Sequence, residues 1–181
     1  MYIEFLLIVF DYFKTLKKKS VIVYEWFFPF ILTIGCVYIA DVKNTELFNS
    51  FKESSINVIG VLLGFSIAVI TILTTGSGDN LDGIRRQETG ITIKNRVIML
   101  YDLLLINFTY SVVLEVVLII SCLTIPLMNQ VFEFSFDVKL FFYSIMVFLV
   151  LHILLLNLRN ITDFYLIVSR PINSNNSSNQ T

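Results

Sequence analysis

Long apolar runs, separated by short polar stretches, make up most of the chain after residue 20. A helix needs about 20 mainly apolar residues to cross the hydrocarbon core of a bilayer, and four runs meet or approach that length. They predict transmembrane helices over residues 21–40, 58–75, 99–127 and 140–169, the last of which continues beyond the membrane. Pro29 should kink the first helix because it lacks a backbone N–H. The pattern predicts an all-α membrane protein with four transmembrane helices and helical extensions outside the bilayer.

Residues 1–20 combine an apolar, aromatic start with a run of lysines. The segment is too short to span a bilayer before its polar residues appear. We therefore expect an amphipathic helix in the membrane interface, with Lys17, Lys18 and Lys19 at anionic lipid headgroups. Insertion of its apolar start as a fifth span is the alternative. Glu25, near the start of the first span, is interpreted as an interfacial anchor favoured by the helix dipole.

The basic residues indicate an orientation, because cytosolic loops of membrane proteins carry an excess of Lys and Arg. Ten of the 13 basic residues lie before the first span, between the second and third spans, or after the fourth. Both termini, residues 76–98 and the helical extensions are therefore expected in the cytosol. External loops are expected at 41–57 and 128–139, too short to form a domain. Residues 170–181 have almost no apolar content and are predicted to be disordered.

Composition narrows the classes of function. With 56% hydrophobic residues, a soluble domain of this length would expose far too much apolar surface to water. The net charge of -1 gives no basic field to attract nucleic acid, so no direct nucleic-acid partner is expected. The sequence holds no catalytic triad, zinc-protease motif or metal-ligand spacing, and its cysteines lie far apart. We therefore expect that the protein is not an enzyme and binds no cofactor or metal. Its expected partner is the lipid bilayer itself.

Small residues recur along one face of the second span. Gly60, Gly64 and Ala68 are spaced four residues apart, and Thr71 and Thr75 continue the same face. Such a stripe lets two helix backbones approach closely, and its hydroxyls can bond to a partner. Three interpretations stay open: packing within one subunit, association between copies, and lining of a water-filled path. Association between copies would make the protein a homo-oligomer.

Three other polar residues lie within the predicted spans. Glu115 is near the middle of the third, where a charged side chain costs at least about 2.5 kcal/mol unless it is paired, hydrated or protonated. It is either a functional carboxylate or a neutral one, hydrogen-bonded to Thr109, Ser111 or a hydroxyl of the second span. For His152 we expect packing or one hydrogen bond, and Asn107 is expected at the polar end of its helix.

The segment "GSGDNLDGIRRQETG" lacks both the ligand spacing of a calcium-binding loop and the lysine of a phosphate-binding loop. We expect a helix cap at Gly76, followed by a short amphipathic helix that carries Arg85 and Arg86. Arg159 and Asp163 are four residues apart on the extension of the fourth span and are expected to pair. These four charged side chains are the predicted contacts for a cytosolic protein partner or an anionic ligand.

The stretch "NVIGVLLGFSIAVITILTTGSGDNLDGIRRQ", together with the four spans and the basic amphipathic start, resembles small four-helix membrane proteins of bacterial anti-phage systems. The membrane subunit of the Kiwa system is one of them. The resemblance implies an oligomer in the bacterial inner membrane that senses infection with a cytosolic partner, or that perturbs the membrane. The alternatives are an ion channel or transporter subunit that uses Glu115 as its titratable site, and a structural accessory subunit.

Overall fold

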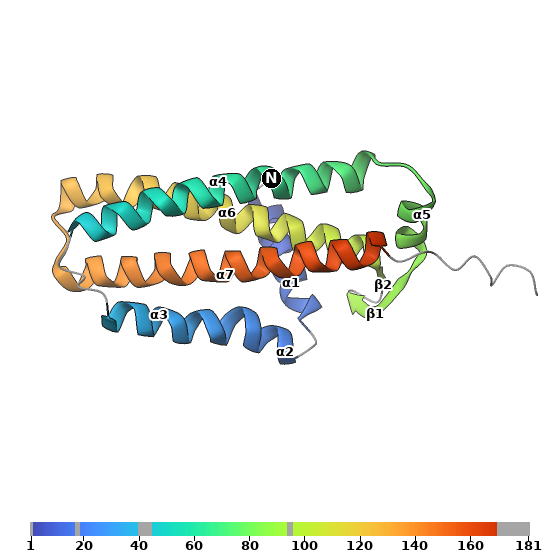
Figure 1. The fold of residues 1–181 in the computed structure, drawn as a ribbon, viewed down its shortest axis with the longest axis horizontal. Coiled ribbons are helices and arrows are strands. Elements are labelled where there is room, and N and C mark those ends of the chain that lie inside the picture. Colours follow the sequence, from blue (N-terminus) through green and yellow to red (C-terminus); the bar gives the residue numbers. More distant parts are fainter. Residues whose placement is uncertain (1, 17–18, 40–44, 94–95, 170–181) are drawn as a thin grey trace, which may run out of the picture.

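The long helices lie side by side along the longest axis of the molecule (Figure 1). The computed structural model describes residues 2–16, 19–39, 45–93 and 96–169. In the described part, four helices are long and apolar enough to cross a membrane: Lys19–Ile39, Asn49–Thr75, Leu100–Phe132 and Phe136–Leu166. The predicted all-α membrane fold is confirmed.

The elements follow one another as the chain runs back and forth through the bundle. They are α1 (Tyr2–Thr15), α2 (Lys19–Ile22), the π-helical turn η1 (Val23–Phe27), α3 (Phe28–Ile39), α4 (Thr45–Thr75), α5 (Asp79–Arg86), β1 (Glu88–Ile93), β2 (Arg96–Met99), α6 (Leu100–Phe132) and α7 (Phe136–Ser169). The helix α5 and the two strands lie together at one end of the bundle, called here the hairpin end.

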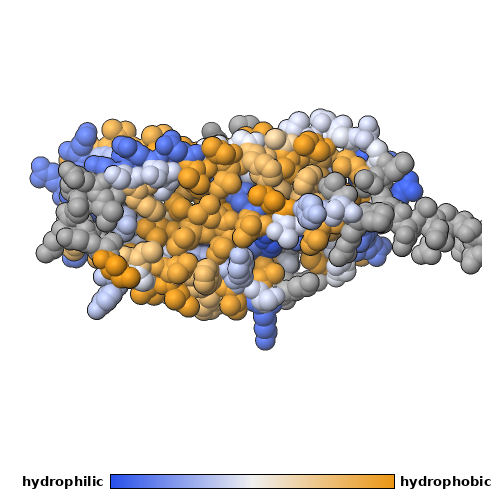
Figure 2. All heavy atoms as spheres, in the orientation of Figure 1, coloured by the Kyte–Doolittle hydropathy of each residue, from blue (hydrophilic) through white to orange (hydrophobic). Residues whose placement is uncertain are grey.

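Three of the long helices form the centre of the bundle. α6 packs on both α4 and α7, and α3 packs on the other side of α7. Buried apolar side chains form one cluster away from the hairpin end, called here the distal cluster, which comprises Ile59, Leu118, Cys122, Met146, Val150 and Ile153. A second cluster, next to α5, comprises Val69, Leu73, Ile84, Leu104 and Phe108. On the face shown in Figure 2, apolar residues cover much of the middle of the molecule, as a bilayer-spanning bundle requires. Hydrophilic residues gather towards its two ends, and a few lie near the centre and at the lower edge of this view.

The helices extend farther than the apolar runs predicted. α4 begins at Thr45, so most of the expected loop 41–57 is helical. α6 continues to Phe132, and only residues 133–135 separate it from α7. Glu133 closes α6 in the left-handed conformation, with φ 45°. Hydropathy marks where a helix leaves the hydrocarbon, whereas backbone hydrogen bonds continue until a cap or turn ends them.

The segment 76–98 contains a β-hairpin that the sequence interpretation lacked. α5 is the expected short helix, and it begins at Asp79 after the predicted helix end at Gly76. β1 and β2 then pair in antiparallel fashion, with Ile93 opposite Arg96. The Thr89 hydroxyl also donates a hydrogen bond to the carbonyl oxygen of Ile98, at 2.6 Å.

Helix α1 crosses the long helices instead of running along them (Figure 1). It packs mainly on α6 and also contacts β1. An amphipathic helix in a membrane interface has this crosswise orientation relative to spanning helices. Lys19 is exposed at the start of α2, while Lys17, Lys18 and the tail 170–181 lie outside the described residues.

Candidate functional site: two buried polar clusters on α7

Helix α7 carries polar side chains on two faces in the interior of the bundle. One face directs His152 and Arg159 towards the first span, and the other directs Asn157 and Asn160 towards α6. His152, Asn157 and Asn160 are each about 1% exposed. Because burial of polar groups in a membrane protein is costly unless they find partners, these two faces form the candidate functional site.

The first cluster, the Glu25 cluster, joins three segments around one carboxylate. Glu25 is fully buried in the π-helical turn η1, and its Oε1 lies 2.6 Å from Nη1 of Arg159. The Tyr12 hydroxyl of α1 donates a hydrogen bond to Oε2. The Tyr12 ring stacks on Tyr110 of α6, with ring centroids 3.6 Å apart. Burial and the adjacent Glu25 carboxylate raise the pKa of Tyr12 well above its usual range, so its hydroxyl remains a donor.

One sequence interpretation is wrong here, and one is confirmed. Glu25 is not an interfacial anchor, because it is fully buried and paired with Arg159. Arg159 lies 4.0 Å from Asp163, so the predicted pair exists only at the distance limit, and the closer partner of Arg159 is Glu25. The Arg159 side chain is 18% exposed, so it is committed mainly to contacts inside the protein.

Pro29 and His152 explain the shape of the first span. A proline removes one hydrogen-bond donor and crowds the carbonyl four residues earlier, which here belongs to Glu25. The helix widens into the π-helical turn η1 just before the proline, with the Phe28 N–H bonded to the Val23 carbonyl oxygen. The freed carbonyl oxygen of Glu25 instead lies 2.6 Å from Nδ1 of His152. A carbonyl only accepts, so Nδ1 donates, and the single hydrogen bond predicted for His152 is confirmed.

The second cluster, the Glu115 cluster, joins α4, α6 and α7. Glu115 Oε1 accepts hydrogen bonds from Asn157 Nδ2 at 2.8 Å, from Ser111 at 3.0 Å and from Ser66 at 3.3 Å. Ser66 also lies 3.2 Å from Asn157 Oδ1. Ser111 and a hydroxyl of the second span were among the predicted partners, whereas Asn157 was missed. Glu115 is 0% exposed, and its Oε2 has no hydrogen-bond partner among the described residues.

Asn107 lies two helical turns from Glu115 on the same face of α6. Its side chain is 4% exposed, so it is inside the bundle. Its backbone oxygen accepts a hydrogen bond from Asn160 Nδ2 at 3.4 Å. Asn160 was also missed, although Asn157 and Asn160 interrupt an apolar run with the three-residue spacing that puts both on one helix face.

The stripe of small residues faces out of the bundle. Gly60, Gly64, Ala68, Thr71 and Thr75 are all exposed, and a methyl group added at Gly60 or Gly64 would meet no atom within 4 Å. The opposite face of α4 supplies the buried contacts. Packing within one subunit is therefore wrong as an account of the stripe, and association between copies or lining of a path stays a prediction.

The two arginines of α5 lie at the hairpin end and are exposed. Arg85 pairs with Asp82 at 3.2 Å and lies over the Tyr101 ring at 5.4 Å. Arg86 has no such partner in the part of the chain that the structure describes. It is the more available of the two for a ligand.

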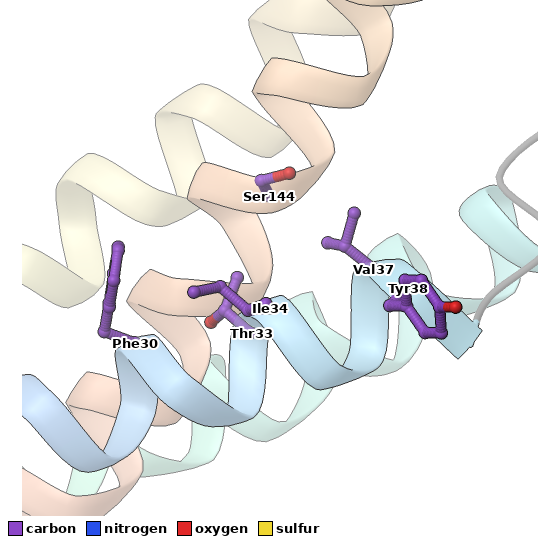
Figure 3. A pocket seen from close by; sticks show the side chains of 6 residues that line it. All are labelled: Phe30, Thr33, Ile34, Val37, Tyr38 and Ser144. Atoms are coloured by element: carbon purple, nitrogen blue, oxygen red, sulfur yellow. The ribbon is translucent and has the colours of Figure 1, made fainter.

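An open groove runs between α3 and α7 (Figure 3). It has a volume of about 490 Å³ and is lined by Phe30, Thr33, Ile34, Val37, Tyr38 and Ser144. The Thr33 hydroxyl bonds back to the Pro29 carbonyl oxygen at 2.8 Å, which satisfies the most buried polar group of this lining. The groove is therefore a mostly apolar surface that suits lipid chains. Within the described residues, no group of three or more His, Cys, Asp or Glu side chains could hold a metal ion.

The fold and the two clusters define a multi-pass helical membrane protein. Comparison with protein-family models, with curated proteins and with solved structures finds no match to this chain.

Proposed function

We propose that this protein is the oligomeric membrane subunit of a bacterial anti-phage system, which detects a disturbance at the inner face of the cell membrane and passes it to a cytosolic partner. The sequence resemblance of residues 57–87 supports the anti-phage context. The distribution of basic residues supports a cytosolic position for the hairpin end. The sensing role is supported by one contact of α1.

That contact is the Tyr12 hydroxyl on the Glu25 carboxylate. α1 crosses the bundle as an interfacial helix would, so changes in lipid packing or surface charge act on it directly. If α1 moves, Glu25 loses the Tyr12 hydroxyl and its pairing with Arg159 is disturbed. Arg159 belongs to α7, and α1 itself contacts β1. A shift of α1 therefore reaches the hairpin end along two routes.

The hairpin end offers the surface for the cytosolic partner. Arg85 and Arg86 are exposed on α5, next to the hairpin. Basic side chains attract an acidic protein surface, and they also bind anionic lipid headgroups by electrostatic attraction. Arg159 and Asp163 were also predicted to contact the cytosolic partner. Arg159 is less available for that contact, because its side chain is turned towards Glu25.

Replacing Tyr12 with phenylalanine should weaken protection against phage. The ring can still stack on Tyr110, but the hydrogen bond to Glu25 is lost. A hydrogen bond to a charged group contributes about 1.5–3 kcal/mol, enough to shift a two-state equilibrium by about tenfold or more. The measurement is plaque formation on cells that express the chain with its neighbouring genes. Tyr24→Phe, at an exposed tyrosine of the first span, is the matched control.

Two results would contradict this proposal at different levels. If the unaltered chain with its neighbouring genes leaves plaque numbers unchanged, the anti-phage context is wrong. If the unaltered chain protects and Tyr12→Phe protects equally well, the role of the Tyr12 contact in sensing is wrong.

Replacing Gly64 with leucine should reduce the size of the oligomer. The position is open, so the subunit itself accommodates the side chain, but a leucine prevents close approach of a second α4. Size-exclusion chromatography with light scattering in detergent measures the mass. Ile72→Leu, an exchange of isomers at another exposed site on α4, should leave it unchanged. An oligomer of unaltered mass in Gly64→Leu would remove the stripe as the interface.

The Glu115 cluster favours a second candidate, an ion channel or transporter subunit. A buried carboxylate near the middle of a span is the kind of group that such proteins use. The polar contacts of Glu115 end at the distal cluster, however, where the buried residues are apolar. A single subunit thus lacks a continuous polar route among its described residues, and a conducting path would have to run between copies.

A further inference from the structure

We propose that Glu115 is the inner end of a hydrated path that enters the bundle between α6 and α7 from the hairpin end, and that its carboxyl group exchanges a proton with water along this path. The ligand is water and the proton that it carries. The inference concerns a different cluster from the Tyr12 contact and is independent of the proposed function.

Three buried oxygens that have no hydrogen-bond partner among the described residues lie along the contact between α6 and α7. They are Oε2 of Glu115, Oδ1 of Asn107 and Oδ1 of Asn160. The three side chains are between 0% and 4% exposed. The two amide oxygens accept hydrogen bonds, while Glu115 Oε2 accepts when ionised and donates when protonated. Buried polar groups without a protein partner are the usual positions of internal water, which both donates and accepts.

The polar groups are spaced closely enough for a chain of waters and side chains. Asn107, Ser111 and Glu115 recur every fourth residue on one face of α6, over about 12 Å. From α7, Asn160 bonds to the Asn107 backbone oxygen at 3.4 Å, and Asn157 bonds to Ser111 at 2.9 Å and to Glu115 at 2.8 Å. Neighbouring polar side chains in this row are therefore separated by no more than about one helical turn.

The row of polar side chains lies closer to solvent at the hairpin end than at the opposite end of the bundle. Between Glu115 and the end of α6 at Phe132 the helix rises about 25 Å, and its buried residues there, Leu118 and Cys122, belong to the apolar distal cluster. The next buried oxygen on that side without a partner among the described residues, Asn129 Oδ1, lies about 21 Å along the helix from Glu115. From Asn107 to the start of α6 at Leu100 it rises about 10 Å. On α7, the next turn after Asn160 carries Asp163, whose side chain is 44% exposed. Water therefore has the shorter and more polar entry from the hairpin end.

The side chains that face Glu115 are uncharged: Ser66 from α4, Ser111 from α6 and Asn157 from α7. Of the ion pairs among the described residues, none includes Glu115. His152 and Arg159 lie on the other face of α7, turned towards Glu25. Since no cationic side chain of the described residues balances a Glu115 carboxylate, a proton delivered by water is the means of neutralising it.

Infrared spectroscopy of the full chain in lipid vesicles tests the proposal. The carbonyl stretch of a protonated Glu115 is identified as the band that disappears in Glu115→Gln. On transfer to D₂O this band should shift as the proton exchanges. Asn160→Leu removes the polar group nearest the entry and should slow the shift by about tenfold or more, which corresponds to about 1.4 kcal/mol in the barrier. Thr162→Val, at an exposed hydroxyl on the same helix, should not slow it.

Asn107→Leu is the second variant, in case Asn160→Leu does not fold by circular dichroism and chromatography. It too lies on the hairpin side of Glu115 and should slow the exchange. Absence of a protonated Glu115 band at every pH would overturn the proposal. A band that never shifts in D₂O would do the same. Exchange at an unaltered rate in a folded Asn160→Leu or Asn107→Leu protein would show that water does not enter from the hairpin end.

Discussion

Replacing Arg159 with methionine should lower the free energy of unfolding by about 3 kcal/mol, the largest effect expected of a single substitution in this protein. Methionine keeps much of the length of the arginine stem but leaves the Glu25 carboxylate buried without its cation. The Tyr12 hydroxyl remains as a donor, yet one hydrogen bond from an uncharged donor does not offset an unpaired charge in the bilayer. Unfolding of the detergent-solubilised protein by increasing amounts of sodium dodecyl sulfate measures the change.

The double variant Glu25→Gln with Arg159→Met separates charge from packing. It removes the uncompensated charge while an amide oxygen can still accept from Tyr12, so most of the lost stability should return. Arg86→Met, at an exposed arginine, should change stability by less than about 0.5 kcal/mol. If the double variant is as unstable as Arg159→Met alone, the loss comes from packing of the arginine stem and the ion pair contributes little.

The four spans were predictable because apolar length is a local property of the sequence. The ends of the helices were not, since residues 45–57 are polar enough to lie in water and still form helix. The hairpin was missed because β1 and β2 are short, at six and four residues. Their β-branched residues, in "ITI" before and "VI" after a two-residue connection, were the available signal.

Specific polar contacts between different helices could not be predicted from the sequence of each helix alone. Ser111 was predicted as a partner of Glu115 because the two are four residues apart on one helix. Asn157 comes from a different helix, and nothing in the local pattern connects it with Glu115. Glu25 was misread for the same reason, because its neighbours in sequence indicate an interface and its true partner, Arg159, lies in the last helix.

The stripe on α4 shows a related limit. Its spacing correctly marks a face of small residues, but periodicity does not say whether that face points into the bundle or out of it. In the structure the buried face of α4 carries Ile59, Ser66, Val69 and Leu73, so the small residues point outwards. The polar residue Ser66 is thus inside, where it bonds to Glu115, and the glycines are outside.

His152 and Pro29 should be energetically coupled, because the histidine satisfies the carbonyl that the proline leaves free. His152→Leu removes the donor to the Glu25 carbonyl oxygen and should cost about 1–3 kcal/mol, the penalty for a buried polar group without a partner.

In a Pro29→Ala background an alanine N–H can bond to that same carbonyl, so the cost of His152→Leu should fall by about 1 kcal/mol or more. The four proteins form a double-mutant cycle, measured by unfolding in sodium dodecyl sulfate. His152→Gln keeps an N–H donor and should cost less than His152→Leu in the Pro29 background. An equal cost of His152→Leu in both backgrounds would mean that His152 stabilises the bundle through its ring contacts with Trp26 and Phe148. The π-helical turn would then not depend on the hydrogen bond from His152.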